Sequence, residues 1–108
     1  EWSKVVAAWY DVIDYLNDPA NRDEAMKILA ARVGVTPEKY ATYMKGTRFL
    51  TAGEAMKIFR KADGFGSVYG SSAITDKFFV DNKIYKENVN ISRCIDPSFT
   101  RAYLKGKK

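Results

Sequence analysis

The stretch Val35–Thr51, VTPEKYATYMKGTRFLT, decides how the chain is arranged, because it contains one short helix and leads into the next. Its Thr36-Pro37 pair is typical of a helix start, where a side-chain cap precedes the residue that fits the first helical position. Gly46 offers a left-handed turn that ends this helix. Thr51 and Glu54 then have the spacing of a capping box and begin another helix. The stretch therefore predicts two helices joined at a glycine turn, around which the flanking segments pack.

The rest of the chain also has helical patterning. Apolar side chains recur at three- and four-residue steps, and no segment alternates apolar and polar residues cleanly over six positions. The predicted helices cover residues 2–16, 21–33, 37–45, 52–61 and 67–82, followed by a short last helix that begins at residues 96–97. We therefore expect an all-α chain of about six short helices in a compact bundle, with residues 1–108 as a single helical domain.

The helix predicted over residues 2–16 has the widest apolar stripe of the chain. The residues of this stripe are Trp2, Val5, Val6, Trp9, Val12, Ile13 and Leu16. Aromatic side chains of this size contribute large apolar areas to protein cores. Trp2 and Trp9 are therefore expected in the core rather than stacked on a ligand.

Composition excludes several kinds of catalytic and metal site. The chain has no histidine, which removes Ser-His and Cys-His catalysis and the commonest metal ligand. Its single cysteine, Cys94, cannot form an internal disulfide. Neither a run of about 20 apolar residues nor a signal peptide is visible. We expect no enzyme activity, no metal site and no cofactor.

The candidate binding residues are Thr47 and Arg48, which follow the helix-ending glycine. The net charge is +5, and the last two thirds of the chain hold all of the positive excess. An arginine can grip a carboxylate, sulfonate or nitrate with its planar fork. The alternative is that Arg48 is solvated or bonds a carbonyl group at the helix end.

Seven phrases, in this order and spacing, carry a resemblance to a known family. They are residues 6–10 (VAAWY), 13–15 (IDY), 21–30 (NRDEAMKILA), 35–40 (VTPEKY), 45–49 (KGTRF), 66–69 (GSVY) and 78–80 (FFV). Together they resemble the C-terminal helical part of solute-binding proteins of ABC importers. The group concerned is the nitrate/sulfonate/taurine/bicarbonate group of type 2 periplasmic binding proteins.

This resemblance implies that the chain is the helical tail of a larger, two-lobed α/β protein. Such a protein closes on a small anionic or organic solute and delivers it to a membrane permease. The implied partners are the remaining lobes of the parent protein, the ABC permease and a small anionic solute. The implied location is periplasmic, or extracytoplasmic with a membrane anchor. In this interpretation the chain supports the packing of a lobe rather than catalysis.

Two alternatives stay open. The first is a basic helical module that binds nucleic acid, based on Lys57, Arg60 and Lys61 in the helix predicted over residues 52–61, although Glu54 opposes them. Because basic residues are few on that helix, nucleic acid is the less favoured partner. The second is a helical protein-interaction or regulatory domain that self-associates through exposed apolar surface.

Overall fold

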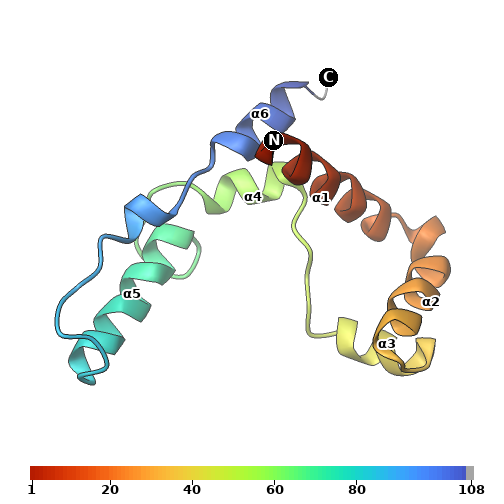
Figure 1. Ribbon diagram of the computed structural model, residues 1–108, viewed down its shortest axis with the longest axis horizontal. Coiled ribbons are helices and arrows are strands. Elements are labelled where there is room, and N and C mark those ends of the chain that lie inside the picture. The colour runs from red at the N-terminus through yellow and green to blue at the C-terminus, as the bar shows by residue number, and fades with distance from the viewer. Residues whose placement is uncertain (107–108) are drawn as a thin grey trace. The chain divides into compact units, whose positions relative to one another are not determined.

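The computed structural model describes residues 1–106, which form six α-helices and two short 3-10 helices (Figure 1). No strand occurs in these residues, so the all-α class and the six predicted helices are confirmed. The α-helices are α1 (Trp2–Asn17), α2 (Arg22–Val33), α3 (Pro37–Met44), α4 (Ala52–Ile58), α5 (Val68–Asp81) and α6 (Ser98–Gly106). The 3-10 helices are η1 (Pro19–Asn21) and η2 (Ile91–Cys94).

The α2–α3 turn follows its sequence signals closely. Gly34 ends α2 in the left-handed conformation, with a φ of 74°. The side chain of Thr36 accepts a hydrogen bond of 3.2 Å from the backbone N–H of Lys39, and Pro37 is the first residue of α3. Both devices satisfy or replace backbone N–H groups that a helix start leaves without partners.

The left-handed turn predicted at Gly46 is wrong. Among the described glycines only Gly34 and Gly64 have a positive φ. The chain instead leaves α3 through two tight turns, in which the N–H of Lys45 donates to the carbonyl of Thr42 and the N–H of Thr47 donates to that of Met44. Turns of this type close without a residue in the left-handed conformation. Gly46 therefore does not have to adopt that conformation.

The contacts of the chain divide it into two units. Unit 1 contains Glu1 and residues 3–51, and unit 2 contains Trp2 and the residues from Ala52 onward. In unit 1, α2 and α3 lie side by side, and η1 packs at the start of α2 (Figure 1). In unit 2, α4 packs on α6 and α5 packs on η2. The expectation of one domain over residues 1–108 stays a prediction.

In unit 2 the start of α5 is fixed against the loop that precedes it. The buried hydroxyl of Ser67 donates to the carbonyl of Arg60 and accepts from the N–H of Tyr69 at 3.1 Å. A Cβ atom on Gly70 would lie 2.3 Å from the carbonyl oxygen of Gly64, so only glycine fits there.

Helix α4 ends at Ile58 rather than at the predicted residue 61.

The core is small, and its composition differs from the prediction. Within residues 1–106 the buried apolar side chains are Tyr10, Ile13, Ala25, Ala30, Ala52 and Ala55. The placement of Trp2 and Trp9 in the core is wrong, because these side chains are 69% and 54% exposed. Helical periodicity correctly grouped the apolar residues on one side of α1, but it does not determine whether another element covers that side.

Four exposed large apolar side chains of α1 form a stripe along the helix. We name it the α1 stripe; it consists of Trp2, Val5, Trp9 and Val12, each more than half exposed. A second exposed apolar pair, Ile74 and Phe78, lies one helical turn apart on α5. Both helices therefore present apolar side chains that this chain does not bury.

Candidate functional site

Thr47 and Arg48 line the same cavity in unit 1. The cavity has a volume of about 190 Å³ and lies between the end of α1, the α2–α3 pair and the connector that leaves α3. Its other lining residues are Leu16, Asn17, Arg22, Met26, Ala41, Met44 and Phe49. The structure thus places both predicted binding residues at one pocket, and it adds a second arginine and an amide to them.

Two contacts hold the connector of this cavity in place. The side-chain amide of Asn17, at the end of α1, donates a 3.3 Å hydrogen bond to the carbonyl oxygen of Phe49. The rings of Trp9 and Phe49 meet edge to face, with their centroids 6.3 Å apart. Phe49 is consequently anchored through both its backbone and its ring, which fixes the position of the neighbouring Arg48 in the chain.

Two hydrogen bonds hold the corner between α1 and α2, next to the cavity residues Leu16, Asn17 and Arg22 in the chain. The phenol of Tyr15 donates a 2.7 Å hydrogen bond to Oε1 of Glu24, and the amide of Asn21 donates to the carbonyl of Tyr15 at 3.2 Å. The hydrogen bond to Glu24 raises the pKa of Tyr15, and desolvation and the charge of Glu24 act in the same direction. These bonds set where α2 begins, and therefore where Arg22 lies.

The chemistry of this cavity suits a small anion with an apolar part. Arg22 and Arg48 supply guanidinium groups, which bind carboxylate or sulfonate oxygens through paired N–H donors. Thr47 and Asn17 add a hydroxyl and an amide. The methionine, leucine and alanine side chains of the wall offer apolar contact for the remainder of such a molecule.

Sequence reasoning missed Arg22, although one signal was available. Arg22 is the first residue of α2, where the positive end of the helix dipole disfavours a cation. A basic residue in this unfavourable position indicates a role other than stabilising the helix. Its proximity to Arg48, however, depends on the α1–α2 corner, which no local pattern predicts.

The basic residues behind the nucleic-acid alternative do not share one helix face. Only Lys57 lies on α4, since the helix ends before Arg60 and Lys61. The ammonium of Lys61 lies 5.6 Å from the centre of the Tyr69 ring. The prediction of a basic helix over residues 52–61 is therefore wrong in this respect.

Within residues 1–106 no group of three or more histidine, cysteine, aspartate or glutamate side chains is placed to hold a metal ion. Over the same residues, none of the helices combines the length and the apolar character that a membrane span requires. Cys94 is exposed and not in a disulfide.

Comparisons with protein-family models, with curated proteins and with solved structures find no match for this chain.

Proposed function

We propose that this chain is the helical packing segment of the solute-binding component of an importer for a small anionic or organic solute. Its role is to cover apolar surface on the other lobes of that component, and it catalyses no reaction. The remaining lobes and the membrane permease are its partners, in an extracytoplasmic setting. The resemblance of seven ordered sequence phrases suggests this class of protein.

The observation that carries the proposal is the α1 stripe. Exposed apolar surfaces of this kind are typical of sites that pack against another protein surface. Two of its four residues are tryptophans, which contribute the largest apolar area of any side chain when they are covered. A chain that worked alone would be expected to place such residues in its own core.

The cavity beside Arg48 supports the part of the proposal that concerns a small anionic solute. Arg22 and Arg48, together with Thr47 on the connector, offer donors for an anionic group next to an apolar wall. In this proposal the pocket contributes contacts to the solute, while the packing surface holds the segment on its parent. The two roles depend on different residues and can be tested separately.

The test is to co-express this chain with the upstream part of its reading frame as two separate polypeptides. We expect a stable one-to-one complex that a Trp9→Asp variant disrupts and that an exposed control variant, Thr42→Asp on α3, leaves intact. A reading frame that joins this chain to a catalytic domain, or upstream lobes that never bind it, would contradict the proposal.

A second candidate function, self-association, is favoured by the spacing within the α1 stripe. Its residues recur at steps of three, four and three, which is the spacing of the seam in paired coiled-coil helices. Light scattering on the isolated chain separates this candidate from the first. A defined dimer that persists when the upstream lobes are present would favour self-association over lobe packing.

A further inference from the structure

Two further cavities lie in unit 2 and share one buried carboxylate, that of Asp76. The larger, about 530 Å³, runs between α5 and residues 88–92, and the smaller, about 290 Å³, lies beside it. Asp76 lines both cavities, together with Val89 and Ile91. None of these residues belongs to the cavity that contains Arg48.

Asp76 is a charged group in an unusual setting. Its residue is 8% exposed, and both carboxylate oxygens accept from one donor, the backbone N–H of Val89, at 3.1 and 3.3 Å. Within residues 1–106 no salt bridge reaches this carboxylate. A buried carboxylate is normally paired with a cation or with several donors, because one hydrogen bond offsets only part of its desolvation.

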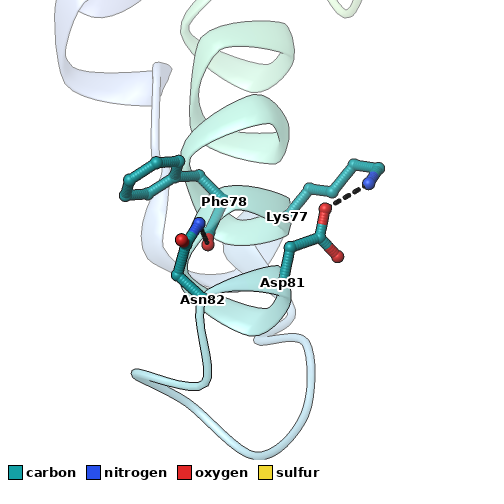
Figure 2. A network of polar contacts seen from close by, with 4 residues as sticks. All are labelled: Lys77, Phe78, Asp81 and Asn82. Carbon is teal, nitrogen blue, oxygen red and sulfur yellow. Dashed lines mark hydrogen bonds and ion pairs between the residues drawn. The ribbon is translucent and has the colours of Figure 1, made fainter.

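The only lysine in these walls is already engaged. Lys77 forms an ion pair with Asp81 one turn further along α5, and both side chains project together from one side of the helix (Figure 2). This pair is locally neutral, so the charge that remains at the larger cavity is that of Asp76. Tyr69, Asn88 and Asn90 add oxygen atoms that can accept hydrogen bonds.

The smaller cavity has two aromatic residues in its wall, along with Ser71, Ser72 and Thr75. Phe79 and Tyr85 are in its wall, with their rings edge to face and their centroids 5.1 Å apart. An aromatic or apolar group therefore has a surface to pack against on one side of Asp76, while a polar head can reach the carboxylate.

From this juxtaposition we infer that the two cavities around Asp76 form a binding site for a small amine with an aromatic or apolar tail. The ammonium group donates hydrogen bonds to the Asp76 carboxylate and supplies the missing positive charge. The tail packs against Phe79 and Tyr85. This site is independent of the proposed importer function, because it uses neither the α1 stripe nor Arg48.

The experiment is an NMR titration of the whole isotope-labelled chain with three ligands of nearly equal shape. The ligands are phenethylamine, its alcohol analogue phenethyl alcohol, and the carboxylate phenylacetate. We expect saturable shifts of the Val89 amide and its neighbours with the amine. The alcohol should bind roughly tenfold more weakly, because it lacks the charge-assisted hydrogen bond, and the carboxylate should not bind.

An Asp76→Asn variant removes the charge but keeps an oxygen that can accept from Val89. It should lose the preference for the amine over the alcohol, whereas Asp63→Asn, an exposed change in the same unit, should retain it. Hydrogen exchange of the Val89 amide shows whether the 88–92 segment stays in place in each variant.

The ligand series on the unmodified chain keeps the inference testable even if Asp76→Asn releases that segment. Equal affinity for the amine and the alcohol, absence of saturable shifts, or an unchanged preference in an intact Asp76→Asn variant would each overturn it.

Discussion

The side-chain amide of Asn17 donates a hydrogen bond to the backbone carbonyl of Phe49, which joins two residues 32 positions apart in the chain. This bond ties the end of α1 to the connector that carries Thr47 and Arg48. It is thus a polar link between the helix that carries the α1 stripe and the pocket that carries the candidate binding residues.

Replacing Asn17 with alanine should destabilise unit 1 modestly and loosen the connector. Loss of one exposed hydrogen bond costs about 1 kcal/mol or less of unfolding free energy. Urea unfolding measures that cost, and hydrogen exchange of residues 47–50 measures the loosening. A matched change, Asn82→Ala, removes an amide that bonds only within the end of α5 (Figure 2). If the connector exchanges equally fast in both variants, the bond does not hold it.

Arg48 and Arg22 should each contribute to binding of a small anion in the unit 1 cavity. Arg48→Gln should weaken binding of methanesulfonate roughly tenfold, since a charge-assisted hydrogen bond is lost. Arg48→Lys should recover only part of the affinity, because a lysine keeps the charge without the planar fork. Isothermal titration calorimetry measures both.

The control for this prediction is Arg32→Gln, in the last turn of α2 and outside the cavity lining. It removes the same net charge. Equal losses of affinity in Arg32→Gln and Arg48→Gln would show that methanesulfonate responds to overall charge, and the pocket assignment would then be wrong.

Replacing glycine with alanine should change the free energy of unfolding in opposite directions at two positions, Gly70 and Gly53. Gly70→Ala forces a Cβ to within 2.3–2.6 Å of backbone atoms of Ala62 and Gly64, and such overpacking costs about 1–3 kcal/mol. Gly53→Ala lies in α4 with nothing near the new Cβ, so it should gain up to about 1 kcal/mol from helix propensity. Thermal unfolding of the two variants compares them, and stabilisation by Gly70→Ala would refute the close approach of α5 to residues 62–64.

The Tyr15–Glu24 hydrogen bond should make the free energy of unfolding depend on pH in the alkaline range. Because the pKa of Tyr15 is raised in the folded state, its contribution is fully present below the ordinary tyrosine value, about 10. The contribution is then lost as the pH rises through the raised folded-state pKa. Tyr15→Phe should therefore be less stable than the parent chain at neutral pH, and the difference should shrink as the pH rises. A difference that does not change with pH would place the effect of Tyr15 in packing alone.

Much of the helical architecture could be predicted from local patterns. Thr36 and Gly34 act at helix ends as their residue types indicate, because caps and left-handed turns depend on a few neighbouring residues. The end of α4 was placed too late. Arg60 lies beyond the end of α4 at Ile58, and its carbonyl accepts from Ser67, a partner that helical periodicity does not reveal.

The candidate site was predictable only in part. Thr47 and Arg48 were proposed from their residue types after a helix end, and the structure places both in the lining of one cavity. Arg22 and Asn17 were missed because tertiary contacts between α1, α2 and the connector place them there. The exposure of Trp2 and Trp9 could not be predicted either, since periodicity identifies an apolar face and not the element that covers it.

The most direct test of the proposed function measures the environment of the two tryptophans, which are the only ones in the chain. Acrylamide quenching and the emission wavelength are recorded for the isolated chain and for the chain in complex with its upstream lobes. The proposal predicts exposed, readily quenched tryptophans in the isolated chain and protected, blue-shifted tryptophans in the complex. Tryptophans that remain equally exposed after the lobes are added would contradict it.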